Sequence, residues 1–390
     1  MIKHVRIRNF KSLGDVSVEM EPVTVLIGRS GTGKSNFVEA IRFLRDYLIR
    51  RGEAFGPGSD WSDVVPATAP ESPMSFRITF DVDGVPGDYV YELSFKAISP
   101  SQQIRAEEKL SLDGKSLFHA TMQQWIEKPR TVAVPPHQNL VLGNLTGVQE
   151  VTIAYLVLAR GVGCHDFSTT LPELDAHARS IVMAHVQSGF RNGQPAADGL
   201  SDSGDNHVET LKAIVDNVRS LNLWRQINAA LRGLNASVRN ADLDSPKRER
   251  VIISHEFSGK ILALNLEQES DGFRRFLYHL IAMYQVPPKQ VLLFEHPENG
   301  IHPGALSLLS DEFKACPGQG RGQVILTTHS PQLLDEFPVE AIRVVDMENY
   351  QTLIGPVAAD QFESVKEKLL SPGELLTVDQ ARIAASAATP

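Results

Sequence analysis

The segment Gly28-Arg-Ser-Gly-Thr-Gly-Lys-Ser35 constrains the fold of this chain more than any other, because its chemistry requires a strand before it and a helix after it. An apolar stretch, Val23 to Ile27, precedes the segment, and an amphipathic stretch, Asn36 to Arg50, follows it. Glycines let the loop's N–H groups point at phosphates, and the helix N-terminus adds partial positive charge. The sequence therefore predicts an α/β protein with a nucleotide-binding P-loop.

Two polar residues of the P-loop have an expected task. Lys34 is expected to reach the β and γ phosphates of ATP, and Ser35 is expected to ligate Mg²⁺. The predicted cofactors are thus ATP and Mg²⁺. The residues predicted to bind the nucleotide in this segment are Gly28, Arg29, Ser30, Gly31, Thr32, Gly33, Lys34, Ser35 and Asn36.

Two further apolar stretches end in residues that suit the same site. Val291 to Phe294 is followed by Glu295, a carboxylate placed to hold Mg²⁺ opposite the serine ligand. Val324 to Thr327 leads to His329, which could reach the γ-phosphate or the attacking water at the carboxyl edge of a parallel sheet. The plainer alternatives are a charged strand end for Glu295 and a structural role for His329.

Composition excludes several other classes of protein. The net charge of -9 argues against non-specific coating of nucleic acid, which requires an excess of Lys and Arg. Cys164 and Cys316 are far apart, so neither a disulfide framework nor a zinc finger is expected. No run approaches the ~20 apolar residues of a membrane span. We expect a cytoplasmic protein without membrane contact.

The order of these segments resembles the ATPase heads of the SMC/RecF-like ABC group, particularly the short AAA-type ATPases related to the OLD family. The matching segments are Arg8-Asn9-Phe10-Lys11-Ser12, the P-loop, Glu298-Asn299-Gly300-Ile301-His302-Pro303 and Thr328-His329-Ser330-Pro331. The resemblance implies a P-loop NTPase fold of the ABC/SMC head type. Alternating apolar residues from Phe76 to Phe95 predict an antiparallel β-meander, and helical periodicity between about Gly147 and Leu234 predicts an inserted helical subdomain.

The same resemblance assigns a partner-dependent role to Ser270-Asp271-Gly272. It implies a signature motif in which Ser270 and Gly272 contact the γ-phosphate of the partner's ATP in a head-to-head dimer, with His329 as the switch histidine. Without the resemblance, the same residues predict a helix cap for the stretch from Asp271 to Tyr284. Both interpretations can hold together.

One position departs from the group's pattern. The residue after the metal-site acid is normally a glutamate that orients or deprotonates the attacking water, and here it is His296. Neutral imidazole accepts a proton but lacks the charge and geometry of a carboxylate. The expected catalytic residues are Lys34, Glu295, His296 and His329, with slow or absent hydrolysis as an open alternative; Glu298 is a candidate substitute base.

The expected organisation has four parts: 1–146, the N-terminal part of the head with P-loop and β-meander; 147–245, a helical insertion; 246–370, the C-terminal part of the head; and 371–390, a tail. Candidate helices of the insertion are Ile153 to Leu158, Ala176 to Phe190 and Val208 to Leu231. Cys164-His165-Asp166 contains metal-capable side chains without a second pair at ligand spacing, and predicts a local turn.

The resulting functional hypothesis is an ATPase whose nucleotide-dependent dimer, or higher assembly, gates a partner effector or DNA in anti-phage defence. Two alternatives stay open: a nucleotide-gated scaffold with negligible hydrolysis, and a RecF-like DNA repair ATPase. About 60 residues follow His329, fewer than the ~100 of a typical added domain, so a nuclease effector is expected to be a separate protein. The basic runs Pro246 to Arg250 and Arg42, Arg45, Arg50 and Arg51 are candidate DNA contacts, although helix charges are usually solvated.

Overall fold

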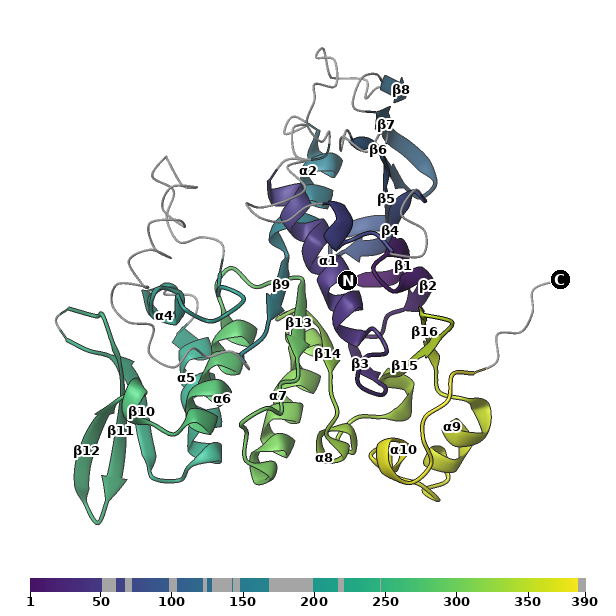
Figure 1. Cartoon of the computed structure of the whole chain (residues 1–390). Helices are drawn as coiled ribbons and strands as arrows, with labels where there is room; N and C mark the ends of the chain where they lie inside the picture. The colour runs from purple at the N-terminus through teal and green to yellow at the C-terminus, as the bar shows by residue number, and fades with distance from the viewer. Residues whose placement is uncertain are drawn as a thin grey trace. The chain divides into compact units, whose positions relative to one another are not determined.

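The computed structural model describes residues 1–50, 61–66, 72–97, 104–121, 125–127, 142, 148–167, 199–216, 221–245 and 247–384 (Figure 1). The chain divides into two compact units. The first comprises Met1–Cys164, Lys289–Glu298 and Ser310–Pro390, and the second comprises His165–Pro288 and Asn299–Leu309. The P-loop and both predicted strand-end sites therefore belong to the first unit, and the signature-like segment belongs to the second.

A six-stranded sheet forms the centre of the first unit, in the order β16-β15-β3-β14-β13-β9. β3 pairs in parallel with β14 and β15, β13 pairs in parallel with β14, and β16 is antiparallel to β15. Because the carboxyl ends of parallel strands meet at one edge, the segments that follow β3, β13 and β14 gather there. The strands are β3 (Val23–Ile27), β9 (Val162–His165), β13 (Val291–Glu295), β14 (Gln323–Thr327), β15 (Ile342–Glu348) and β16 (Gln351–Pro356).

A seven-stranded antiparallel sheet, in the order β2-β1-β4-β5-β6-β7-β8, completes the first unit and contains the predicted meander. One face is apolar and packs on α1 (Lys34–Ile49), where the Tyr47 and Phe95 ring centroids lie 4.8 Å apart. Aromatic pairs at such distances add to the stabilisation by apolar burial. The strands are β1 (Ile2–Phe10), β2 (Leu13–Glu19), β4 (Met74–Val82), β5 (Val85–Ala97), β6 (Ile104–Leu112), β7 (Lys115–Thr121) and β8 (Trp125–Glu127).

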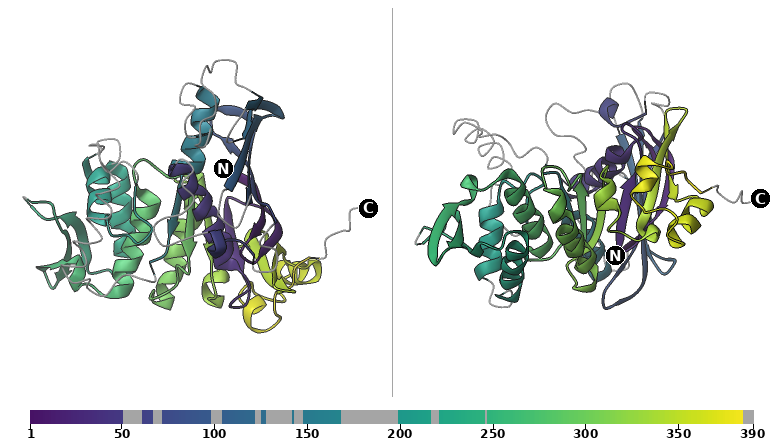
Figure 2. Two further views of the ribbon diagram at one scale, coloured as in Figure 1. Left: turned by 45° about the horizontal axis from the view of Figure 1, so that its top comes forward. Right: turned by 90° about the horizontal axis from the view of Figure 1, so that it is seen from below.

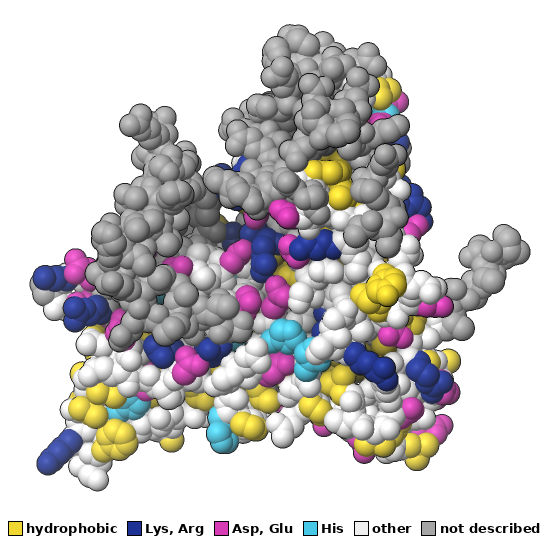
Figure 3. Space-filling model, in the orientation of Figure 1, with side chains coloured by type: hydrophobic (Ala, Val, Ile, Leu, Met, Phe, Trp, Pro, Cys, Tyr) yellow, Lys and Arg dark blue, Asp and Glu magenta, His cyan; other side chains and the backbone are white. Residues whose placement is uncertain are grey.

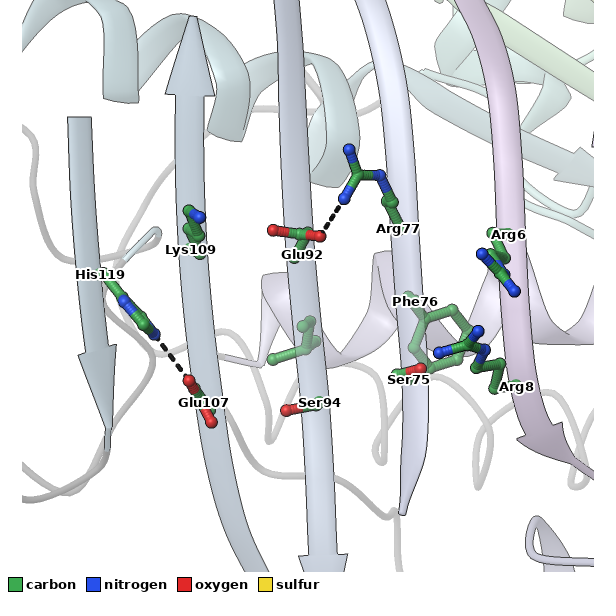
Figure 4. Close-up of a pocket in the computed structure, with 11 residues that line it drawn as sticks. Arg6, Arg8, Ser75, Phe76, Arg77, Glu92, Ser94, Glu107, Lys109 and His119 are labelled. Atoms are coloured by element: carbon green, nitrogen blue, oxygen red, sulfur yellow. Dashed lines mark hydrogen bonds and ion pairs between the residues drawn. The ribbon is translucent and has the colours of Figure 1, made fainter. Parts of the chain in front are cut away.

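The opposite face of this sheet is charged, as the alternation of side chains along each strand requires. Figure 4 shows it as a row of mixed charges across β1, β4, β5, β6 and β7. The side chains of Arg77 and Glu92 form one ion pair, and His119 Nε2 lies 2.6 Å from Glu107 Oε1. Acidic and basic groups alternate here, so this face is not a uniformly positive surface.

The helices of the first unit surround the six-stranded sheet and one face of the seven-stranded sheet (Figure 1). α1 is the helix that follows the P-loop. α7 begins in the second unit and continues in the first. The helices are α1 (Lys34–Ile49), α2 (Gln149–Tyr155) with its π-helical extension Leu156–Arg160, α7 (Leu306–Gly318), α8 (Pro331–Leu334), α9 (Ala359–Lys366) and α10 (Glu374–Thr377).

In its described residues, the second unit combines the helices α4, α5 and α6 with a three-stranded antiparallel sheet in the order β10-β11-β12 (Figures 1 and 2). α6 packs against both α4 and α5. The elements are α4 (His207–Asp216), α5 (Leu221–Leu234), β10 (Val238–Leu243), β11 (Val251–Phe257), β12 (Lys260–Asn265) and α6 (Asp271–Tyr284).

The predicted helices of the insertion have different outcomes. The prediction for Ala176 to Phe190 lies outside the described residues. The prediction for Val208 to Leu231 corresponds to α4 and α5, which lie on either side of the undescribed residues 217–220. None of the helices in the described part of the chain is long and apolar enough to cross a membrane.

Candidate functional site

Glycine geometry shapes the P-loop between β3 and α1. Gly28, Gly31 and Gly33 have φ values of +152°, +80° and +104°, a region that other residues rarely adopt. A Cβ on Gly28 would lie 2.0 Å from the carbonyl oxygen of Val345, and one on Gly33 would lie 2.0 Å from Thr352 Oγ1. The loop is therefore packed directly against the β15–β16 hairpin.

Two hydroxyl side chains that the sequence did not mark as site residues hold the P-loop in place. Thr352 Oγ1 donates to the carbonyl oxygen of Thr32 at 2.8 Å and lies 2.6 Å from Ser12 Oγ. Asn36 Nδ2 donates to the same Ser12 Oγ at 2.7 Å. Ser12 is part of the opening run that resembles the SMC/RecF-like group, whereas nothing in the sequence around Thr352 indicates a site.

A cavity of about 260 Å³ brings the P-loop together with both predicted histidines. Figure 3 shows histidine side chains at the surface of the face seen in Figure 1. This cavity volume lies just below the usual range for small-molecule sites, and a space of this size suits the phosphate tail of a nucleotide. The lining residues are Ser30, Gly31, Gly33, Lys34, Ser35, Asn36, His296 and His329.

A second cavity, of about 300 Å³, adjoins the first half of the P-loop and shares His329 with the first cavity. Its walls include Gly28 and Arg29 on one side and the segment from Leu375 to Ala381 on another. The guanidinium of Arg29 donates to the side-chain oxygen of Gln380. The chain after α10 thus lies directly beside the P-loop.

Lys34 lies across the P-loop and is almost fully buried. Its Nζ donates to the carbonyl oxygens of Gly28 and Arg29, both at 2.8 Å. Burial lowers the pKa of this ammonium group to about 8, although the carboxylate of Glu298 acts in the opposite direction. The Lys34 ammonium group is therefore bonded to two loop carbonyl oxygens, which the oxygens of a bound phosphate can replace as acceptors.

Glu295 ends β13 with its side chain only 12% exposed and forms an ion pair with Arg42 of α1 at 3.3 Å. The sequence makes Arg42 and Arg45 candidate DNA contacts, with a solvated helix face as the alternative. Arg42 instead faces Glu295, and Arg45 is 9% exposed and bonded to Asp46. These two arginines do not form a free basic surface.

His296, Glu298 and His329 form one cluster at the sheet edge. The two imidazole rings stack with centroids 5.1 Å apart and an interplanar angle of 9°. Glu298 Oε1 accepts a hydrogen bond from the backbone N–H of His329 at 2.9 Å and lies 3.7 Å from His296 Nδ1. One carboxylate oxygen thus contacts both segments that the sequence predicted to approach the nucleotide.

The backbone at His296 is strained. Its φ is +47°, which for a non-glycine residue costs roughly 1–3 kcal/mol and is typical of functional sites. Its N–H donates to the carbonyl oxygen of Thr327 at 3.1 Å and contacts Thr327 Oγ1 at 3.2 Å. The end of β14 therefore fixes the direction in which His296 leaves β13.

The cluster contains an ionised acid next to a neutral base. Burial opposes ionisation of Glu298, but the nearby His296 ring, the hydrogen bond from the backbone N–H of His329 and the neighbouring Thr328 outweigh it and lower the carboxyl pKa. Burial, together with the charge of Lys34 and the ring of His296, lowers the pKa of His329, against the opposing effect of Glu298. At neutral pH, Glu298 is an anion and His329 is uncharged.

Ser270 and Gly272 belong to the second unit. Ser270 is the N-cap of α6, and its Oγ accepts a hydrogen bond from the backbone N–H of Phe273 at 3.2 Å. A Cβ on Gly272 would lie 2.7 Å from the carbonyl oxygen of Gly300. The predicted helix cap is confirmed, and the glycine allows close packing of two backbones.

One prediction on possible metal chemistry has a clear outcome. The turn expected at Cys164-His165-Asp166 is wrong, because Cys164 and His165 lie in β9, where buried apolar neighbours favour a strand. Cys164 and Cys316 are buried and form no disulfide. Within the described ranges, no group of three or more His, Cys, Asp and Glu side chains is arranged to hold a metal ion.

Comparisons with known proteins agree with this geometry. Residues 1–117 match a family described as "AAA ATPase domain", and residues 177–335 match one described as "AAA domain, putative AbiEii toxin, Type IV TA system". A curated relative, the Old nuclease of Escherichia phage P2, is 21% identical over a 369-residue alignment that covers 87% of this chain. The chain spans 58% of the length of that relative.

Solved structures share the fold. An SMC head bound to the C-terminal winged-helix domain of ScpA gives a TM-score of 0.55 at 14% identity, covering 92% of this chain and 99% of that chain. The SMC head with an extended coiled coil, bound to the C-terminal domain of ScpA from Pyrococcus furiosus, gives 0.51 at 13% identity, covering 94% and 99%.

The fold is that of a P-loop head of the ABC/SMC type, which confirms the predicted fold class. With the family matches and the curated relative, the chain is similar to the SMC/RecF-like ATPases related to the OLD proteins. The predicted resemblance is thereby confirmed.

Proposed function

We propose that this chain binds ATP with Mg²⁺ and hydrolyses it slowly, in a site completed by the signature segment of a second copy. The main support is the cavity in which the P-loop meets His296 and His329, because it places a buried cation and two imidazoles around one space. Lys34 binds the β and γ phosphates, and the loop N–H groups bind the remaining phosphate oxygens.

The residues around Ser35 and Glu295 fit Mg²⁺. It is a hard cation that prefers oxygen ligands, and it usually takes few of them from the protein and the rest from phosphates and water. Ser35 lines the cavity, and Glu295 supplies a carboxylate at the end of β13 that already binds a cation, the Arg42 guanidinium. When bound there, Mg²⁺ would neutralise charge on the transferred phosphoryl group.

His296 is the proposed base for the attacking water. It occupies the position at which the related ATPases carry a glutamate, and Glu298 lies beside its Nδ1. An ionised Glu298 orients the ring and stabilises the imidazolium that forms when His296 accepts a proton. Neutral His329 lies beside this ring and is proposed to contact the γ-phosphate.

The second copy supplies Ser270 and Gly272 to the γ-phosphate, so ATP binding closes a dimer and hydrolysis opens it. We infer that this cycle gates a separate effector. The SMC heads of similar fold were solved with a ScpA domain bound, and the curated relative is a nuclease. A nuclease is thus one candidate effector, and anti-phage defence is the proposed setting.

A mixing experiment tests the shared site. Lys34→Ala and Ser270→Arg chains should each be inactive alone, the first through a broken P-loop and the second through a broken signature. In an equal mixture, half of the dimers are mixed, and each mixed dimer has one intact site. Turnover should recover to about a quarter of the native rate. A mixture as inactive as its components would contradict a site shared between copies.

The pKa of Lys34 predicts how ATP affinity depends on pH. Lys34 binds phosphate in its charged form, and its pKa is about 8 before ATP binds. Bound phosphates raise that pKa, so affinity should be constant below pH 8 and fall above it by up to about tenfold per pH unit. The dissociation constant of a fluorescent ATP analogue, measured from neutral pH to about two units higher, checks this. A constant affinity over that range would contradict it.

A nucleotide-gated scaffold is the second candidate function. His296 favours it, because imidazole carries no negative charge with which to hold and activate the water. In that case ATP would assemble the dimer and its partner with negligible hydrolysis. A RecF-like repair role is a third candidate and requires DNA to stimulate turnover. The mixed charges on the outer face of the seven-stranded sheet give it little support.

A further inference from the structure

A buried side-chain pair fixes the residue immediately before Ser270. His255 Nε2 on β11 lies 2.6 Å from Glu269 Oε1, and the two side chains are only 5% and 9% exposed. A carboxylate can only accept, so the imidazole donates its Nε2–H. Removing either partner would leave a buried polar group unsatisfied, which is costly in an interior. The pair therefore fixes the position of Glu269 relative to the three-stranded sheet.

The imidazole is itself held from its other side. His255 Nδ1 lies 2.8 Å from Ser237 Oγ, just before β10, and the ring stacks on Phe257 with centroids 5.9 Å apart. The order serine, histidine, carboxylate is that of a nucleophilic triad, but the N–H and O–H of Ser237 are both directed at Asn235 Oδ1. Ser237 is thus engaged in a local turn, and the chain of contacts serves to orient His255.

The residues after Ser270 are held equally closely. Arg275 Nε donates to Asp271 Oδ2 at 2.7 Å, and its Nη1 donates to the carbonyl oxygen of Phe167 at 2.6 Å. The backbone of Gly272 packs on the carbonyl oxygen of Gly300. The signature segment is therefore fixed on both sides of Ser270. Its serine is presented by a rigid support, which precise positioning of a phosphate-binding group requires.

We propose that His255 and Glu269 are positioning residues that align Ser270 for the γ-phosphate bound by the partner copy. This inference rests on the proposed function, in which Ser270 completes the partner's site. Neither side chain touches the nucleotide. Their effect passes through the Glu269–Ser270 peptide, and a displacement of about 1 Å at such a contact is enough to lower a rate by about 100-fold.

The test measures kcat and KM for ATP in four variants: His255→Gln, Glu269→Gln, Ser270→Ala and the control Glu256→Gln. Glu256 neighbours His255 on β11 but forms only an exposed ion pair with Arg239. The first two variants should lose at least about tenfold in kcat with KM and ATP affinity unchanged, and Glu256→Gln should match the native chain. Thermal unfolding of each variant confirms that it is folded.

Mixing separates positioning from general damage. In a dimer of His255→Gln and Lys34→Ala chains, the working P-loop belongs to the first chain and meets the intact signature of the second. Turnover per working site should therefore return to the native value. Failure of this recovery while the Lys34→Ala and Ser270→Arg mixture does recover, or native kcat in both His255→Gln and Glu269→Gln, would overturn the inference alone. Native kcat in Ser270→Ala would overturn the proposed shared site as well.

Discussion

The Lys34→Ala protein is expected to lose ATP binding and turnover while remaining folded. Lys34 Nζ donates to the carbonyl oxygens of Gly28 and Arg29, the positions from which it can transfer to phosphate oxygens. Charge-assisted hydrogen bonds contribute about 1.5–3 kcal/mol each, so losing two of them should weaken ATP binding by at least about 100-fold. Titration with a fluorescent ATP analogue measures the affinity directly.

A second lysine of the same unit provides the control. Lys314 of α7 is half-exposed and pairs with Asp311 at 2.9 Å. Lys314→Ala removes the same side chain from a surface ion pair and should leave ATP affinity unchanged. If Lys34→Ala bound ATP as tightly as Lys314→Ala, the P-loop would not be the nucleotide site.

The edge of the parallel sheet was predictable because each of its elements has a local signal. The P-loop follows a strand, and Glu295 and His329 follow two others, so parallel pairing alone places all three at one edge. Local sequence patterns of this kind predict the structure well because the local signals and the tertiary fold agree.

The residues that hold this sheet edge and the P-loop in place could not be predicted from the sequence. Thr352 donates a hydrogen bond to Thr32 of the P-loop, which lies 320 positions earlier in the chain. Val345 packs against Gly28, and these two residues are similarly far apart in the sequence. Neither Thr352 nor Val345 stands out in its strand, because β15 opens with a continuous buried run and β16 shows only a partial alternation. The Arg42–Glu295 pair was missed for the same reason, since helix periodicity does not reveal which charge a partner element will meet.

For the role of His296 in hydrolysis, the sequence and the structure supply different observations. The sequence has a histidine at the position where related ATPases carry a glutamate. This difference suggests that hydrolysis is weak. The left-handed backbone, the stacking on His329 and the contact with Glu298 became visible only in the structure. Together they place the imidazole in a fixed orientation beside an anion, which is the arrangement of an assisted base.

Replacement of His296 is therefore expected to separate binding from hydrolysis. His296→Ala should keep ATP affinity, because the P-loop is intact, and should lower kcat by about 100-fold or more, the usual contribution of a positioned base. His119→Ala, which removes a histidine from the outer face of the seven-stranded sheet, is the matched control and should keep native kcat. Single-turnover measurements with saturating ATP isolate the chemical step.

His296→Glu decides between the two leading functions. It restores the carboxylate at the position where the related ATPases carry one, next to Glu298 and within the cavity that holds Lys34. If the native chain exceeds His296→Ala while His296→Glu gains a further factor, the imidazole is a working but weaker base. If the kcat of the native chain equals that of His296→Ala and only His296→Glu hydrolyses ATP, the native site binds ATP without hydrolysing it. The dimer would then be an ATP-held scaffold whose opening depends on its partner.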